Sequence, residues 1–195
     1  MTDRPTNRWL ATDAPRGDVY DARYERRAAA GENVHGEADF VMQTGVRSVL
    51  DAGCGTGRIA RELAKRGLDV TGVDIDAEML ATGQRKAPEL DWRLGDLETI
   101  ALGRTYDAAL MAGNVVIFLT PGSEGAVLAN LARHLNPGGI VIAGFQIQRG
   151  RLSLEGYDAL ARSAGLELAE RYATWDREPW RDGGDYAVSV HRRTA

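Results

Sequence analysis

A length of 195 residues fits one domain with a sizeable core better than two full domains. Hydrophobic residues make up 44% and charged residues 27%, as in ordinary globular proteins, and the formal net charge of −4 gives no general attraction to nucleic acid or to an anionic membrane. No stretch approaches the ~18 consecutive apolar residues of a membrane span, and no apolar leader core is visible, so we expect a cytoplasmic protein.

The N-terminal part is predicted to be a tail followed by two helices. Residues 1–15 are rich in Thr, Asp, Arg and Pro, and we expect them to be mobile. Helical spacing follows over residues 18–29, where Tyr20 and Tyr24 lie four apart and share one face, and again over residues 37–43. Because both helices precede the first predicted strand, they could cover the ligand edge of a sheet.

The first predicted strand ends in a glycine-rich turn. Residues 49–58 read VLDAGCGTGR, an apolar run that ends in Asp51 and continues into a helix over residues 59–65. Glycine tolerates positive φ and has no Cβ, so a ligand can lie against the backbone, and the free N–H groups at the helix start can donate to it. Cys54, the single cysteine, excludes an internal disulfide and a cysteine-based metal cluster; we interpret it as a small turn residue, not a catalytic thiol.

Beyond this turn, strands and helices alternate. Strands are predicted at residues 69–75, 90–96, 106–114, 140–145, 166–175 and 186–191, a turn at residues 136–139, and helices at residues 77–86, 121–135 and 153–163. Asp76 is the predicted N-cap of the first of these helices, and Pro121 opens the second. Alternation implies a parallel sheet covered on both faces, and the missing helix between the last two strands makes the final strand antiparallel. We therefore expect an α/β fold with a doubly wound, mostly parallel seven-stranded sheet.

The residues best suited to chemistry follow successive strands. In such sheets, ligands bind at the carboxyl ends of the strands, where the strand order reverses. Asp51, Asp74, Asp96 and Asn114 each stand at a predicted strand end. A carboxylate about 20 residues beyond a glycine turn is placed to accept the ribose hydroxyls of a nucleoside. The pattern predicts a nucleotide-like ligand.

The motifs resemble those of class I S-adenosylmethionine-dependent methyltransferases, in the broad group that acts largely on small molecules. VLDAGCGTG is followed in the expected order by GVDID, LGDLE, YDAALMAGNVVIFL and LNPGGIVIAGF. The resemblance is strong over residues 46–145. It implies a Rossmann-like methyltransferase fold in one domain overall, with a tail and helical cover at residues 1–45 and the S-adenosylmethionine-binding part at residues 46–195.

The resemblance also implies which residues hold the methyl donor. They are Asp51, Gly53, Cys54, Gly55, Gly57, Asp74, Ile75, Met79, Asp96, Leu97, Asn114 and Val115. Asp51 and the glycine turn would hold the methionine part, Asp74 the ribose and Asp96 the adenine amino group, while Asn114 lies in the region of the methionyl ammonium and the substrate entrance. Met79 would pack on the adenine, although its helical spacing also suits a structural core residue.

No residue with a catalytic role stands out. Methyl transfer from a sulfonium is an in-line displacement, so alignment and exclusion of water dominate, and a base is needed only if the acceptor must lose a proton early. The weak catalytic candidates are His35, Tyr20 and Tyr24. A lone histidine such as His35 is more often a polar loop residue, and the two tyrosines could close over the carboxylate of the donor or anchor their helix to the sheet. His134 and His191 are interpreted as structural, and no metal site is expected.

The acceptor is not identified by the sequence. Asn114 begins Asn-Val-Val-Ile, not the Asn/Asp-Pro-Pro-aromatic tetrapeptide associated with methylation of exocyclic amines of bases, so we expect a small-molecule acceptor methylated on O, N, S or C, and no nucleic acid or membrane partner. Trp175 and Trp180 could contact it or pack the sheet edge. Two alternatives stay open: a non-catalytic binder of S-adenosylmethionine or S-adenosylhomocysteine, and a nicotinamide-dependent dehydrogenase, whose third turn glycine normally comes one residue later. The oligomeric state is left open.

Overall fold

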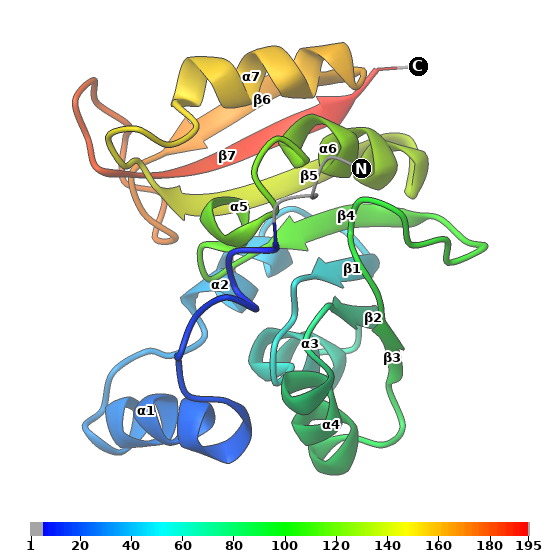
Figure 1. Cartoon of the computed structure of the whole chain (residues 1–195), viewed down its shortest axis with the longest axis vertical. Coiled ribbons are helices and arrows are strands. Elements are labelled where there is room, and N and C mark those ends of the chain that lie inside the picture. Colours follow the sequence, from blue (N-terminus) through cyan, green and yellow to red (C-terminus); the bar gives the residue numbers. More distant parts are fainter. Residues whose placement is uncertain (1–5, 195) are drawn as a thin grey trace.

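A seven-stranded sheet in the order β3-β2-β1-β4-β5-β7-β6 forms the centre of the computed structural model, which describes residues 6–194 (Figure 1). Only β7 runs antiparallel to its neighbours, so the predicted fold class is confirmed. The strands are β1 (Ser48–Ala52), β2 (Asp69–Asp74), β3 (Asp91–Leu94), β4 (Tyr106–Met111), β5 (Leu135–Gln146), β6 (Leu166–Tyr172) and β7 (Tyr186–Arg193). The helices are α1 (Gly17–Ala29), α2 (Gly36–Met42), α3 (Arg58–Lys65), α4 (Ala77–Lys86), α5 (Val115–Phe118), α6 (Glu124–Arg133) and α7 (Leu154–Ser163).

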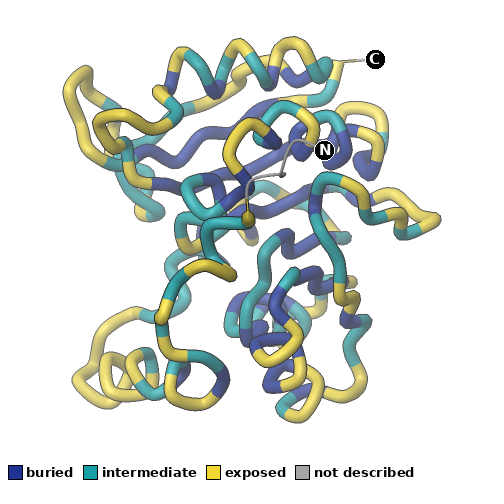
Figure 2. Tube along the Cα trace, in the orientation of Figure 1, coloured by how far each residue is buried: buried dark blue, intermediate teal, exposed yellow. Residues whose placement is uncertain are grey.

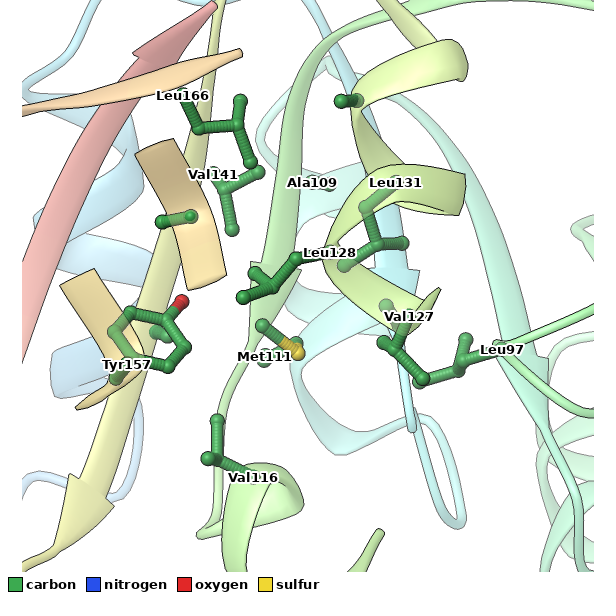
Figure 3. Packing of buried hydrophobic residues seen from close by; sticks show 14 of the residues in the cluster. Leu97, Ala109, Met111, Val116, Val127, Leu128, Leu131, Val141, Tyr157 and Leu166 are labelled. Atoms are coloured by element: carbon green, nitrogen blue, oxygen red, sulfur yellow. The ribbon is translucent and has the colours of Figure 1, made fainter. Parts of the chain in front are cut away.

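The sheet is buried on both faces, which explains why its central strands read as nearly continuous apolar runs. Successive strand residues point to opposite faces: Val49 joins the core under α2, α3 and α4, while Leu50 joins the core under α5, α6 and α7. Figure 3 shows the second core, with Leu128 and Leu131 of α6 directed towards the sheet. In Figure 2 the central strands are dark blue, whereas exposed residues lie on the outer sides of the helices.

The helix after β2 forms as predicted because its start is encoded locally. The Asp76 carboxylate caps α4, with Oδ1 accepting from the backbone N–H groups of Glu78 at 3.0 Å and Met79 at 3.2 Å.

The prediction that Pro121 opens a helix over residues 121–135 was wrong. The short helix α5 forms first, directly after β4, and Pro121 lies in the turn that follows it. Helix α6 begins only at Glu124, after Ser123, whose hydroxyl donates to the Thr120 carbonyl at 2.8 Å.

The predicted turn at residues 136–139 was also wrong, because β5 runs through it. Leu135 pairs with Tyr106, the register then shifts, and Ile140 pairs with Ala108. A Cβ at Gly139 would lie 3.0 Å from the Asp107 carbonyl oxygen, so the strand can pass its neighbour at this bulge only with a glycine there.

The predicted mobility of residues 1–15 does not hold for residues 7–15, and residues 1–5 lie outside the described part. The Trp9 ring packs edge-on against Phe118, with centroids 5.5 Å apart, and the Trp9 N–H donates to the Phe118 carbonyl at 3.3 Å. Figure 1 shows this dark blue segment on the side of the sheet towards which the β4 and β5 arrowheads point. Between residues 6 and 194, no helix is both long and apolar enough to cross a membrane.

Candidate functional site

A cavity of about 320 Å³ opens at the carboxyl ends of β1, β2 and β4, where the strand order reverses. Its floor is made by the strand ends and the glycine turn, and its roof by the N-terminal segment, α1 and α5. The predicted residues that line it are Asp51, Gly53, Cys54, Gly55, Asp74, Ile75, Met79, Asp96, Leu97, Asn114, Val115, Tyr20 and Tyr24. The lining includes neither Gly57 nor His35.

The turn requires glycine at two positions for different reasons. Gly53 has φ +81°, and a Cβ there would lie 2.6 Å from a methyl carbon of Val115, the residue that closes this side of the cavity. Gly57 has φ +73°, and a Cβ there would run into the Trp92 ring, which packs against the back of the turn. Positive φ and close approach together explain why the chain can bring its backbone to the cavity wall here.

Asp74 is held rigidly at the end of β2. Its Oδ2 accepts from the Gly55 N–H at 2.7 Å, and its Oδ1 from the Asp76 N–H at 2.8 Å. Burial raises the pKa of this carboxyl, and the backbone N–H groups that donate to it oppose the shift. Because each carboxylate oxygen has a second lone pair, Asp74 can accept two further hydrogen bonds, such as those of a diol, without losing the backbone bonds.

Asp51 is the buried acid without a full set of partners. It is 2% exposed, and among the described residues its Oδ2 has no hydrogen-bond partner. Burial raises the pKa of this carboxyl to about 7, against the opposing attraction of the Arg58 guanidinium. A buried acceptor without a partner is costly, so a ligand that brings a positively charged donor to this wall would complete the site.

The far end of the floor is fixed by backbone contacts. Asp96 Oδ1 accepts from the Glu98 N–H at 2.9 Å, and the Leu97 carbonyl accepts from the Asn130 side chain at 2.8 Å. Met79 is buried, lines the cavity, and its sulfur accepts from the Gly17 N–H at 3.4 Å. Met79 therefore fits both of its predicted roles, as a wall of the site and as a contact that holds α1.

Asn114 adopts a left-handed conformation where β4 passes into α5. Its φ is 69°, and its side-chain oxygen accepts from the Gln146 N–H at 2.8 Å, which ties this corner to β5. The conformation turns the chain so that Val115 projects over Gly53.

The roof is aromatic, and most of its residues were not predicted from the sequence. Trp9, Tyr20 and Phe118 line the cavity, and the Trp9 ring meets the other two edge-on, at centroid distances of 6.0 Å to Tyr20 and 5.5 Å to Phe118. The Trp9 Nε1–H donates to Asp76 Oδ2 at 2.9 Å, and the Arg16 Nε–H donates to the same oxygen at 2.5 Å. The sequence feature that could have predicted this contact is Trp9 itself, a tryptophan in a mostly polar N-terminal tail.

The roof is also fastened to the floor through α1. Asp21, buried on α1, accepts from the Thr56 hydroxyl in the glycine turn and from the Lys86 ammonium at 2.5 Å. Tyr20 and Tyr24 stand one helical turn apart, with ring centroids 5.8 Å apart, so they share a face as predicted.

The remaining candidates lie in or beside the cavity without an evident chemical role. Burial raises the pKa of the Cys54 thiol well above its usual value, which disfavours a thiolate nucleophile. His35 lies outside the cavity lining, with Nε2 3.9 Å from a carboxylate oxygen of Glu62. Trp175 and Trp180 do not line the cavity either: both pack against the hydrophobic cores, which agrees with the second of the two roles considered for them.

Two histidines predicted to be structural are held in buried contacts. His134 Nε2 accepts from the Leu102 N–H at 3.2 Å, and His191 Nε2 lies 3.0 Å from Asp158 Oδ1. Burial lowers the pKa of His191, and the neighbouring Asp158 charge opposes this. Within residues 6–194, no three or more His, Cys, Asp or Glu side chains gather as a metal-ion site would require.

Comparison with known proteins relates this chain and its fold to methyltransferases. A family model described as a methyltransferase domain matches residues 49–139. The crystal structure of a TehB-like SAM-dependent methyltransferase from Corynebacterium glutamicum has a TM-score of 0.84 at 34% sequence identity, covering 91% of this chain and 97% of that one.

Two curated relatives show shorter matches. The dTDP-3-amino-3,4,6-trideoxy-alpha-D-glucopyranose N,N-dimethyltransferase of Streptomyces venezuelae is 33% identical over 132 residues, which are 64% of this chain and 54% of that protein. The trans-aconitate 2-methyltransferase of Azoarcus sp. is 35% identical over 96 residues, which are 48% of this chain and 37% of that protein. The chain thus spans about half or less of the length of these curated relatives.

Proposed function

The chain belongs to the class I S-adenosylmethionine-dependent methyltransferase family, and we propose on this premise that it transfers a methyl group from S-adenosylmethionine to a small-molecule acceptor. One observation carries the proposal. Two buried carboxylates, Asp51 and Asp74, stand at neighbouring strand ends in one cavity beside a glycine turn, and Asp51 keeps an oxygen without a hydrogen-bond partner among the described residues.

The residues of the floor match the parts of this donor. Asp74 would accept the ribose hydroxyls, and the unpaired oxygen of Asp51 would meet the positive charge of the methionine part. The donor-binding residues we propose are Asp51, Gly53, Cys54, Gly55, Gly57, Asp74, Ile75, Met79, Asp96, Leu97, Asn114 and Val115. All of them except Gly57 line the cavity, and Gly57 shapes the turn from behind, against Trp92.

The work of the protein in this reaction is alignment and exclusion of water. When bound, S-adenosylmethionine supplies a methyl group attached to a positively charged sulfur. The methyl group passes to the acceptor, and the sulfur remains in the leaving group as a neutral thioether. Asp51 and Asp74 would hold the methionine part and the ribose of the donor at fixed separation, because both side chains are buried and stand on adjacent paired strands. Val115 and the aromatic roof of Trp9, Tyr20 and Phe118 would keep water away from the reacting atoms.

The acceptor is proposed to be small because the relatives are named for small acceptors, an amino sugar attached to dTDP and trans-aconitate. The absence of the Pro-Pro tetrapeptide after Asn114 supports the same class against nucleic acid. We propose residues 1–45 as the cover and residues 46–195 as the donor-binding part. A cytoplasmic location stays a prediction from the sequence.

Calorimetry with S-adenosylhomocysteine and with NAD(H) and NADP(H) tests the donor. We expect micromolar binding of S-adenosylhomocysteine and none of the nicotinamide nucleotides; the opposite pattern would refute the proposal. Asp74→Ala should weaken S-adenosylhomocysteine binding at least about tenfold, because a hydrogen bond to a charged group is worth about 1.5–3 kcal/mol. Asp69→Asn is the matched control, since Asp69 is an exposed carboxylate at the opposite end of the same strand.

A labelled-methyl transfer screen against small-molecule extracts then separates an enzyme from a non-catalytic binder. Incorporation of label into a low-molecular-weight product is the expected result. Tight donor binding with no labelled product in any extract would favour a regulatory module instead.

A further inference from the structure

We infer that the acceptor is an anionic small molecule whose carboxylate or phosphate group is bound by Arg23 at the mouth of the cavity. This inference rests on the proposed methyl transfer and narrows its substrate class.

The charges along the cavity single out Arg23. The cationic side chains in its lining are Arg23 and Arg58. Arg58 is already committed: its two terminal nitrogens donate to the Glu37 carboxylate at 3.1 and 2.6 Å. Arg23 is exposed, and within residues 6–194 it makes no ion pair. Among the described residues that line the cavity, Arg23 is thus the guanidinium that has no carboxylate partner and could bind an anionic ligand.

The Arg23 side chain is held in place without that counter-charge. Its guanidinium carbon lies 3.9 Å from the Tyr20 ring centroid and 4.6 Å from that of Tyr24. Its Nη2 donates to the Tyr24 hydroxyl at 2.9 Å. Stacking on two rings restricts the side chain before any ligand arrives, and the remaining N–H groups can take an oxyanion in a two-pronged hydrogen bond.

The surroundings favour an anion with an apolar body. Trp9 and Phe118 continue the roof beside Tyr20, so the rest of the acceptor would lie against aromatic rings. A cationic acceptor would be repelled by Arg23 at the roof, and a neutral one would leave the Arg23 guanidinium without a counter-charge.

The carboxylate of the methyl donor is the competing partner for Arg23. Two observations separate the two. The donor floor is buried at Asp51 and Asp74, whereas Arg23 is exposed. Gly57, the N-cap residue of α3, has no side chain to cap the helix, and Ala60 donates to Asp51, so the backbone N–H groups of the first two residues of α3 can receive the donor carboxylate. The effects of an Arg23 substitution on donor binding and on acceptor binding can therefore be measured separately.

The test uses the full chain saturated with S-adenosylhomocysteine and four probes that share a phenyl ring and differ in charge: benzoate, phenyl phosphate, benzamide and benzylamine. We expect benzoate or phenyl phosphate to bind at least about tenfold more tightly than the neutral and cationic probes. Which of the two anions binds better distinguishes a carboxylate acceptor from a phosphorylated one. Arg23→Gln should abolish the preference while changing the S-adenosylhomocysteine Kd less than about twofold.

Arg26→Gln is the matched control, because Arg26 is an exposed arginine of the same helix that does not line the cavity. This variant should leave the affinities for S-adenosylhomocysteine and for the anionic probes unchanged. With an acceptor in hand, Arg23→Gln should raise its KM more than it lowers kcat. No anion preference in the unaltered protein would overturn the inference, even if methyl transfer itself is observed. Equal weakening of S-adenosylhomocysteine and of the anionic probes by Arg23→Gln would overturn it too, by assigning Arg23 to the donor.

Discussion

Asp51→Asn, examined across pH, tests the electrostatics of the donor site most directly. The Asp51 carboxyl is buried, its Oδ2 has no hydrogen-bond partner among the described residues, and its pKa is raised to about 7. In an unfolded chain its pKa would be about 3.9. The ligand-free protein therefore keeps Asp51 largely protonated at pH 6 and largely ionised at pH 8. Asparagine keeps the shape of the side chain and removes the titration.

The sign of the stability effect follows from the raised pKa. Between pH 4 and pH 7 the folded protein holds one proton more at Asp51 than the unfolded chain does, so the free energy of unfolding falls as pH rises through this window. A shift of about three pKa units corresponds to an effect on the order of 4 kcal/mol. Asp51→Asn should flatten this fall in the ligand-free protein, a change that denaturation curves at pH 4.5 and pH 7.5 would measure.

The effect on donor binding has the opposite sign. A ligand that places a positive charge beside Asp51 binds its ionised form, so binding at pH 6 releases close to one proton and binding at pH 8 releases almost none. The affinity for S-adenosylhomocysteine should therefore fall about tenfold for each pH unit below 7. Calorimetry in buffers of different ionisation enthalpy counts the released protons. Proton release by Asp51→Asn equal to that of the unaltered protein would refute the reasoning.

Two further predictions concern the turn and the roof. Gly57→Ala should lower the free energy of unfolding, measured by urea denaturation, by at least about 2 kcal/mol, because its Cβ would meet the Trp92 ring at positive φ. Gly67→Ala, also at positive φ but with open space around it, should lower it by only about 1 kcal/mol, and equal losses would contradict the steric argument. Trp9→Phe should keep the contact with Phe118 but lose the hydrogen bond to Asp76, which should speed amide exchange over residues 7–12; unchanged exchange would show that this bond does not hold the tail.

The parts of the fold that could be predicted are those with local causes. The Asp76 side chain caps α4 through N–H groups two and three residues away, so the residues at the helix start suffice to place it. The glycine turn is similar, because the positive φ of Gly53 and Gly57 is a property of single residues. The partner of Gly57 was not foreseeable: Trp92, far along the chain, is the side chain that forbids a Cβ there.

The failed predictions concern segments whose structure depends on distant neighbours. Residues 136–139 carry the composition of a turn, yet they fall within β5, at the place where its register against β4 shifts. Residues 7–15 have a polar composition typical of a mobile tail. They are ordered because Trp9 finds an aromatic partner in Phe118 and an acceptor in Asp76, neither of which local composition reveals.

The same division explains why the donor could be predicted and the acceptor could not. The floor is built by short motifs that each follow a strand, whereas the N-terminal part of the roof contacts Asp76 from positions 60 and 67 residues earlier in the chain. Asp76 joins the two: its Oδ2 accepts from Trp9 and Arg16, its Oδ1 caps α4, and its N–H donates to Asp74. A displacement of Asp76 would therefore change the hydrogen bonds of the N-terminal tail and also those of the carboxylate proposed to hold the ribose. Because coupling between two sites is reciprocal, a roof that closes on Asp76 should tighten donor binding by the factor with which the donor stabilises the closed roof.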